Sequence, residues 1–248
     1  MVRLLLWING LVYVFLFLVQ KRAMWLPLSS APDLQIPYTQ VAVQFLGLVP
    51  AEVVRHLALW QLVTYMFLHI SFWHLLLNML GLWWFGVEVE RLWGSRYFLW
   101  YYFFTGIGAA LTSLVVALFL PGQMHASTFG ASGAIFGLLL AYGLLFPNRL
   151  IYLYFVIPVK AKYCVLAFFV ITLGYLVTSS DTGVSHSAHL GGGIFGVVWF
   201  LFFGRDLHFS DLWRRFLRWK RRRRLRVIRR KGEDDDSLGG SYSSKTVH

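Results

Sequence analysis

Long apolar stretches separated by short polar breaks run through most of this chain. Six of them have the composition of membrane-spanning helices: residues 4–19, 62–85, 98–120, 132–146, 163–178 and 189–203. Several are shorter than the roughly 20 residues that cross a bilayer, so we expect them to extend into the flanking loops or to lie tilted. The pattern predicts an all-α membrane protein, a bundle of six transmembrane helices.

The overall composition supports this interpretation. Hydrophobic residues make up 58% of the chain and charged residues only 14%, against roughly 25% charged in soluble domains. We expect one membrane domain, residues 1–204, and no separate soluble domain. The single cysteine, Cys164, lies in an apolar stretch and cannot form an internal disulfide, so we interpret it as a small core or lipid-facing residue.

The beginning of the chain has two interpretations. Arg3 and the apolar residues 4–19 resemble a signal peptide, but Lys21 and Arg22 stand where a cleavage site would have small residues, which favours a retained helix. Residues 23–60 mix four prolines with large apolar side chains. They predict a long, partly amphipathic loop in the membrane interface.

Basic residues predict the orientation of the helices. If both termini are cytoplasmic, the connections 122–128 and 179–183 lie outside and hold no Lys or Arg. The inner loops then hold Arg91, Arg96, Arg149, Lys160 and Lys162. Positive residues favour the cytoplasmic side, so we expect cytoplasmic termini, although Lys21, Arg22 and Arg55 fall on the outer side in this topology.

The region after the last apolar stretch is strongly basic. Residues 205–231, with five consecutive cations at 220–224, carry most of the formal net charge of +12. Nucleic-acid binding is one interpretation, but a basic cluster beside a membrane helix more simply anchors to anionic lipid, at about 1 kcal/mol per charge. We therefore expect membrane lipid and no nucleic acid as a partner. The acidic, then Gly- and Ser-rich residues 232–248 complete this tail and predict disorder.

Four polar residues lie inside three of the apolar stretches. His74 and Asn78 are in the second, Ser132 in the fourth and His189 in the sixth. In the predicted topology these three helices run in the same direction, so all four side chains fall at a similar depth near the outer face. An ionisable residue is costly in lipid and marks a functional site, and a serine near a histidine indicates nucleophilic catalysis.

The spacing within the second stretch adds geometry. His74 and Asn78 are four residues apart and lie on one face of a helix. His69 lies five residues before His74, about 140° away around an ideal helix. We expect His69 to cap the helix or to form a hydrogen bond near its start, outside the pair.

Two pairs of glycines predict close helix packing. Gly133 and Gly137 lie four residues apart in the fourth stretch, as do Gly192 and Gly196 in the sixth. Such faces let helix backbones approach closely in lipid. Packing alone explains them, but close approach would also bring Ser132 within hydrogen-bonding distance of His189.

Taken in order, His69-x4-His74-x3-Asn78, Gly130-x-Ser132-Gly133 and Ala188-His189 with Gly192-x3-Gly196 resemble the rhomboid family of intramembrane serine proteases. The resemblance covers roughly residues 60–204. It implies a six-transmembrane-helix rhomboid-like bundle in which Ser132 is the nucleophile and His189 the general base.

The resemblance also implies roles for neighbouring residues. His74 and Asn78, with the backbone N–H of Ser132, would stabilise the oxyanion, and donors of this kind contribute about 2.7 to 4 kcal/mol each. Gly130 matches a glycine that hydrogen-bonds substrate or shapes the site. Glu90 resembles a structural carboxylate that follows the second helix.

The chain departs from the family pattern at two positions. Gln61 follows Trp60, where the family often has arginine, so the contacts that replace that arginine are open. Phe136 stands four residues after Ser132, where many relatives have a tyrosine that stacks on the catalytic histidine. Phe136 keeps the ring and lacks the hydroxyl.

The resemblance predicts a serine endopeptidase that cleaves transmembrane helices of membrane-protein substrates near the outer face. A rhomboid-like pseudoprotease that binds or chaperones membrane proteins without cleavage is the alternative. A small transporter is a further alternative, but we find no internal repeats of the usual kind. No metal-ligand spacing or phosphate loop is apparent, so we expect no cofactor. Without a targeting extension, a bacterial inner membrane is the expected location, and the oligomeric state is open.

Overall fold

The longest apolar helices of the computed structural model are α1 (Val2–Arg22) and α7 (Ser95–Phe119). The structure describes residues 1–22, 25–28, 31–120, 122–153, 156–178 and 185–203. Within this part, α1 and α7 are long and apolar enough to cross a membrane. Three shorter apolar helices are α8 (Ser132–Leu145), α9 (Ala161–Val177) and α10 (His186–Phe202). The fold is therefore mostly helical, and the number of six spans stays a prediction.

The second predicted span, 62–85, is bent rather than continuous. It consists of α4 (Gln61–Thr64) and η1 (Tyr65–Phe67), followed after a 99° bend by α5 (Phe72–Gly81), the π-helical η2 (Leu82–Gly86) and α6 (Val87–Trp93). Leu68 is extended, and Ser71 caps α5 by accepting a hydrogen bond from the His74 backbone N–H at 3.2 Å. A serine cap stabilises a new helix start, so the apolar stretch begins a second helix here.

The expectation of an all-α protein is wrong in one respect, because two short antiparallel hairpins are present. One pairs β1 (Trp25–Leu28) with β2 (Ala31–Pro37), and the other pairs β3 (Leu150–Leu153) with β4 (Ile157–Lys160). The predicted interfacial loop 23–60 thus contains the first hairpin and two helices, α2 (Tyr38–Leu46) and α3 (Pro50–His56). Short apolar runs of this length suit a strand as well as a helix.

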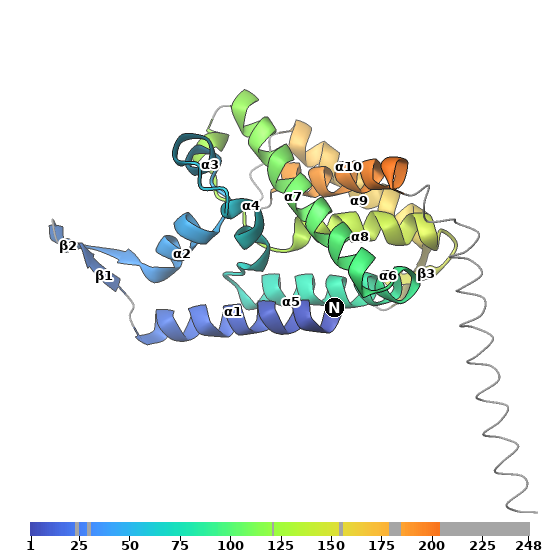
Figure 1. The fold of residues 1–248 in the computed structure, drawn as a ribbon, viewed down its shortest axis with the longest axis horizontal. Helices are drawn as coiled ribbons and strands as arrows, with labels where there is room; N and C mark the ends of the chain where they lie inside the picture. The colour runs from blue at the N-terminus through green and yellow to red at the C-terminus, as the bar shows by residue number, and fades with distance from the viewer. Residues whose placement is uncertain (23–24, 29–30, 121, 154–155, 179–184, 204–248) are drawn as a thin grey trace, which may run out of the picture. The chain divides into compact units, whose positions relative to one another are not determined.

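Helix α8 occupies the inside of the bundle, where it contacts α7, α9, α10 and η2 (Figure 1). Tyrosine hydroxyls join the inner helices through backbone carbonyls. Tyr65 donates to the Gly106 carbonyl at 2.7 Å, and Tyr101 donates to the Gly137 carbonyl at 2.6 Å. Both tyrosines are fully buried. Because unpaired polar groups are costly in a dry interior, these bonds favour a single arrangement of the helices that carry the site.

The carboxylate of Glu90 joins the start of α1 to α6 and α7. It accepts hydrogen bonds from the backbone N–H of Val2 at 2.9 Å and from the Ser95 hydroxyl at 2.6 Å, and it pairs with the backbone amine of Met1. Helix α1 then lies beside α5 (Figure 1). Glu90 therefore has a structural role, because it holds together the first residues of α1 and α7.

Gln61 is almost completely buried, at 1% exposed, and holds the segment around α2 against α4. Its side-chain oxygen accepts from the Val49 backbone N–H at 2.9 Å, and its amide donates to the Gln44 carbonyl at 2.8 Å. The indole of Trp60 adds a 2.8 Å bond to the Phe45 carbonyl. These are the contacts that Gln61 makes where the family often has arginine.

Replacing Gln61 with leucine is expected to lower the free energy of unfolding by about 2 kcal/mol or more. Leucine has a similar volume but leaves the buried Val49 N–H and the partly buried Gln44 carbonyl without their partners. A buried orphaned group costs about 1 to 3 kcal/mol, and the partly buried carbonyl adds to this cost. Denaturant unfolding in detergent micelles measures the effect. The exposed Gln40 of α2 provides the control, because Gln40→Leu is expected to change stability by less than about 0.5 kcal/mol. Equal effects of the two changes would contradict the assignment.

Candidate active site

Ser132 is the first residue of α8, directly after a sharp turn at Gly130. Gly130 has φ +110°, a conformation that glycine adopts without strain, and its N–H donates to the Tyr65 carbonyl at 2.8 Å. A Cβ at this position would lie 2.7 Å from the ring of His74. Glycine therefore makes room for His74 beside the turn that presents Ser132.

The side chains of Ser132 and His189 form a hydrogen bond. The distance from His189 Nε2 to Ser132 Oγ is 2.8 Å. His189 lies in the first turn of α10, where its backbone N–H donates to the Ser185 carbonyl at 3.2 Å. Serine and histidine, 57 residues apart in the sequence, thus meet between the starts of two helices.

Close packing of α8 and α10 permits this contact. A Cβ on Gly192 would overlap the carbonyl of Gly133, with the carbonyl carbon only 2.8 Å away. A Cβ on Gly196 would lie 2.8 Å from the Tyr101 hydroxyl. Gly192 thus packs directly on the α8 backbone, whereas Gly133 and Gly137 face Ala109 and Thr105 of α7. The small residues therefore permit close packing of α7, α8 and α10, as they do between membrane helices.

The ring of Phe136 stacks on the imidazole of His189. The ring centroids are 4.2 Å apart and the planes differ by 9°. Phe168 and Phe169 of α9 meet the same phenyl ring edge-on, at centroid distances of 6.3 and 5.7 Å. Aromatic pairs of these geometries are favourable. Phe136 therefore stacks on the imidazole without a tyrosine hydroxyl, while Phe168 and Phe169 hold the phenyl ring itself.

His74 and Asn78 lie on one face of α5, as their spacing predicts. The ring of His74 lies against Gly130 and meets Phe129 edge-on at a centroid distance of 5.8 Å. The Asn78 amide is buried and donates to the His74 carbonyl at 2.8 Å. An amide nitrogen carries two hydrogens, so a second donor of Asn78 is available. The structure thus brings His74 beside the turn that leads to Ser132, with Asn78 one helical turn further along α5.

His69 lies in the bend before α5 and not on the helix that the sequence predicted for it. Ser71 provides the cap, so the expected capping role of His69 is wrong. His69 is buried, and its ring lies 5.0 Å from the ring of His74, centroid to centroid. It therefore packs beside the ring of His74.

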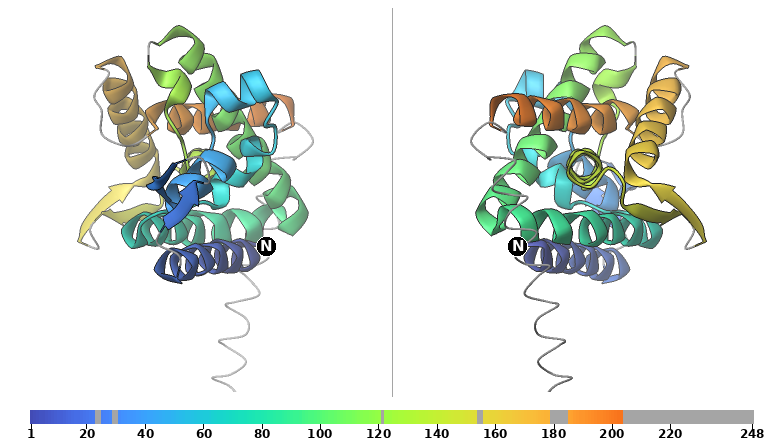
Figure 2. Two further views of the ribbon diagram at one scale, coloured as in Figure 1. Left: turned by 90° about the vertical axis from the view of Figure 1, so that its left-hand side faces the viewer. Right: turned by 90° about the vertical axis from the view of Figure 1, so that its right-hand side faces the viewer.

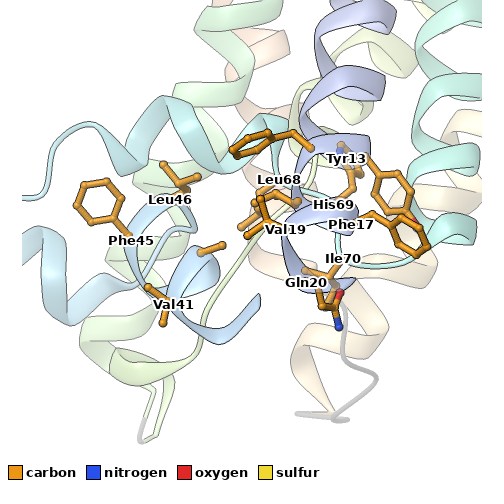
Figure 3. A pocket seen from close by; sticks show the side chains of 13 residues that line it. Tyr13, Phe17, Val19, Gln20, Val41, Phe45, Leu46, Leu68, His69 and Ile70 are labelled. Carbon is orange, nitrogen blue, oxygen red and sulfur yellow. The ribbon is translucent and has the colours of Figure 1, made fainter. Parts of the chain in front are cut away.

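The other side of His69 borders an apolar pocket of about 320 Å³ (Figure 3). The pocket lies between α1, α2 and the bend before α5, and its walls include Tyr13, Phe17, Val41, Phe45 and Leu68. Neither Ser132 nor His189 lines it. His69 thus lines this pocket and also contacts the ring of His74.

A chain of hydroxyls beside the site was missed by the sequence analysis. Ser113 of α7 bonds to Ser187 at 3.0 Å, Ser187 to Ser185 at 3.3 Å, and Thr128 donates to Ser185 at 3.1 Å. The backbone of Thr128 also pairs with Leu48 at 2.8 and 2.9 Å. These bonds tie the segment before Ser132 to the start of α10. In the sequence, only the two serines that flank His186 could have indicated this chain of hydroxyls, because Ser113 and Thr128 are distant from them.

The fold and site together define a helical membrane protein with a hydrogen-bonded serine and histidine between packed helix ends. The family model described as Rhomboid domain matches residues 56–206 of this chain, which is more than half of its length. The chain therefore belongs to the rhomboid family.

Three relatives illustrate the range of the family. The chain is 31% identical over 152 residues to RHOMBOID-like protein 12, mitochondrial, of Arabidopsis thaliana, covering 56% of this chain and 45% of the relative. It is 34% identical over 134 residues to Rhomboid protein 1, mitochondrial, of Saccharomyces cerevisiae, covering 54% and 38%. It is 36% identical over 139 residues to Rhomboid protease GluP of Bacillus subtilis, covering 55% and 24%. The chain thus spans less than half the length of these curated relatives.

The family and the apolar helices make this an integral membrane protein. Two of the three relatives carry mitochondrial names and one is bacterial. The expected bacterial inner membrane is therefore not supported.

Proposed function

We propose that this chain is an intramembrane serine endopeptidase that cleaves transmembrane segments of membrane proteins. The observation that carries the proposal is the 2.8 Å hydrogen bond between Ser132 Oγ and His189 Nε2. A hydroxyl paired with an imidazole base is an activated nucleophile. One relative, at 36% identity, is named Rhomboid protease GluP, and this name supports the same assignment.

In the proposed mechanism, the Ser132 hydroxyl attacks the carbonyl carbon of the substrate peptide bond while His189 Nε2 accepts its proton. The tetrahedral intermediate collapses when the imidazolium of His189 gives that proton to the leaving amine. Water, deprotonated by His189, then attacks the acyl carbon. The bond from that carbon to Ser132 Oγ breaks as the imidazolium returns its proton to Oγ, which releases the acid and restores both residues. Phe136 supports this role, because its stacking on His189 keeps the imidazole in the plane that faces Ser132.

The negative oxygen of the intermediate needs hydrogen-bond donors. Ser132 begins α8, and the first N–H groups of a helix lack intrahelical partners. Its N–H, together with the side chains of His74 and Asn78, would stabilise the oxyanion. Gly130 supports this arrangement by leaving space for His74, and His69 by packing beside His74.

Changing His74 to alanine is expected to lower kcat by about 100- to 1,000-fold, with a smaller effect on KM, because oxyanion donors act mainly in the transition state. Asn78→Ala is expected to act in the same direction. Steady-state cleavage of a transmembrane substrate in detergent measures both constants. His125 offers a control, since it is exposed in η3 (Gln123–His125) and His125→Ala should leave kcat unchanged. A change in KM alone for His74→Ala would argue for substrate binding instead.

The proposal includes the topology predicted from the sequence. Six spans with both termini cytoplasmic would place the starts of α8 and α10 near the outer face. In this arrangement residues 1–204 form the membrane domain, and the basic region 205–231, which lies outside the described residues, binds anionic lipid. The substrates are transmembrane proteins, and the protein uses no cofactor.

The direct test is reconstitution of the wild-type chain with a fluorescent transmembrane substrate in liposomes. We expect two fragments whose joint mass equals that of the substrate plus water. A pseudoprotease would bind the substrate and leave it intact. Binding without fragments over a range of substrates with helix-destabilising residues would favour that alternative.

A further inference from the structure

The hairpin of β3 and β4 extends outward from the helices in both views of Figure 2. It connects the end of α8 to the start of α9, and its register pairs Leu150 with Lys160 and Tyr152 with Pro158. Two backbone bonds close its base, from the Ala161 N–H to the Arg149 carbonyl at 2.8 Å and from the Lys162 N–H to the Pro147 carbonyl at 3.2 Å. These two bonds attach β3 and β4 to the ends of α8 and α9.

One face of the hairpin is apolar and uncovered. Ile151 is buried at 5% exposed, so its face packs inward. On the opposite face, Leu150 and Tyr152 are 47% and 48% exposed, because successive strand residues alternate between faces. Val156, just before β4, is 75% exposed, and Ile157, which pairs with Leu153 on the face of Ile151, is still 55% exposed. Such a cluster of large apolar side chains marks a binding surface.

Positive charge accompanies this apolar face. Lys160 ends β4 beside Leu150, and Lys162 follows two residues later, with its ammonium 4.9 Å from the Tyr163 ring. Within the described part of the chain neither lysine takes part in an ion pair. Arg149 at the base pairs with Glu88 at 3.1 Å. The surface therefore combines exposed aliphatic and aromatic groups with two cations.

The position of the hairpin in the fold indicates which environment this surface contacts. The hairpin follows the carboxyl end of α8, whereas Ser132 lies at the amino end. The two ends of this helix are about 21 Å apart, since it has 14 residues at a rise of about 1.5 Å each. Directly after the hairpin, α9 exposes Tyr163 and Leu166 at 55% and 61%. An apolar helix of a membrane protein exposes such residues to lipid. The hairpin thus leaves the bundle at the end of a lipid-facing helix, where hydrocarbon gives way to headgroups.

We propose that the β3–β4 hairpin is a lipid-binding element that lies in the membrane interface and selects anionic phospholipid. Leu150, Tyr152, Val156 and Ile157 contact the upper part of the acyl chains. Lys160 and Lys162 bind headgroup phosphates, in the way that basic residues beside membrane helices attract anionic lipid. The proposal rests on membership of a membrane family and on the hairpin itself, not on proteolysis, and it is separate from any binding by the basic tail.

The depth of the hairpin is measured with a fluorophore at its exposed apolar end. In a Cys164→Ser background, Val156→Cys is labelled with an environment-sensitive dye and reconstituted in vesicles of seven parts phosphatidylcholine to three parts phosphatidylglycerol. We expect a blue-shifted emission and stronger quenching by lipid nitroxides near the headgroup than by those near the bilayer centre. Gln123→Cys, exposed in η3 at the other end of α8, should show neither. Emission typical of water at position 156 would overturn the proposal.

Lipid selection is measured by native mass spectrometry of the full chain carrying Ser132→Ala, so that proteolysis plays no part. Lys160→Gln with Lys162→Gln is expected to reduce retained phosphatidylglycerol at least threefold relative to phosphatidylcholine. The control pair, Arg3→Gln with Arg55→Gln, changes two other exposed cations and leaves the same basic tail in place. Equal losses in both pairs would overturn the proposal. So would disulfide dimers through Val156→Cys with no lipid preference, because they would assign the surface to a second copy of this chain.

Discussion

Replacing Ser132 with alanine is expected to lower the rate of substrate cleavage by about 10⁴-fold or more, to the level of the background reaction. The change removes the oxygen that attacks the peptide carbonyl, and loss of the nucleophile in a serine protease costs a factor of this size or larger. The remaining donors still stabilise an oxyanion, but no acyl-serine forms. Cleavage of a transmembrane substrate in proteoliposomes, followed by gel densitometry over days, covers the required range.

The same variant is expected to remain folded. Ser132 is partly exposed and loses a single hydrogen bond to His189, so the free energy of unfolding should change by about 1 kcal/mol or less. Thermal unfolding curves of the variant and the wild type are compared. The same midpoint in both would show that the variant has lost catalysis and not its folded structure. Undiminished cleavage by a folded Ser132→Ala protein would contradict the proposed nucleophile.

Replacing Gly192 with alanine is expected to have the second largest effect, on both stability and activity. Its new Cβ would overlap the Gly133 carbonyl, and backbone cannot move aside as the end of a flexible side chain can. Overpacking of this kind costs about 1 to 3 kcal/mol. Helices α8 and α10 must separate, which moves His189 from Ser132, and a shift of about 1 Å costs about 100-fold in rate.

The control for this change is Gly174→Ala in α9. No atom outside its own neighbourhood lies within 4 Å of a Cβ built there, so alanine should be neutral or slightly stabilising, since it favours a helix over glycine by about 1 kcal/mol. Unfolding midpoints and initial cleavage rates are measured for both variants. If Gly192→Ala kept wild-type activity, close contact of the two helices would not be required for catalysis.

Much of the site's geometry could be predicted from the sequence, because it depends on regular helices. Once three helices run in the same direction, Ser132, His189 and His74 fall near the same end of the bundle. Gly192 then permits the close approach of α10 to the Gly133 carbonyl, and the structure has Ser132 and His189 in contact at 2.8 Å. The four-residue spacing likewise gives His74 and Asn78 one face of α5. Their catalytic roles remain the proposal that the experiments address.

The features that the sequence analysis missed depend on local competition or on distant partners. Hydropathy treats residues 62–85 as one apolar stretch, whereas the Ser71 cap starts a new helix and turns the chain by 99°. This bend removes His69 from the helix and gives it a place beside His74. The backbone partners of Gln61 lie 12 to 17 residues away, and no short-range pattern indicates them.

The hairpin between α8 and α9 shows the same difficulty. Residues 150–160 are a short apolar run with β-branched and aromatic residues, and hydropathy alone does not distinguish a strand from part of a helix at this length. Its exposed face becomes apparent only when Ile151 is seen to be buried and Tyr152 exposed. Surface properties of this kind require the arrangement of the neighbouring helices.

The most direct test of the central claim, that Ser132 is a nucleophile activated by His189, is covalent labelling by a fluorophosphonate. The folded protein is treated with the probe, digested and examined by mass spectrometry. We predict a phosphonyl adduct on the peptide that contains Ser132, formed at least about 100-fold more slowly when His189 is changed to alanine, since general-base catalysis contributes about 10²- to 10⁴-fold. An adduct on another residue, no adduct on folded protein, or equal labelling without His189 would contradict the account.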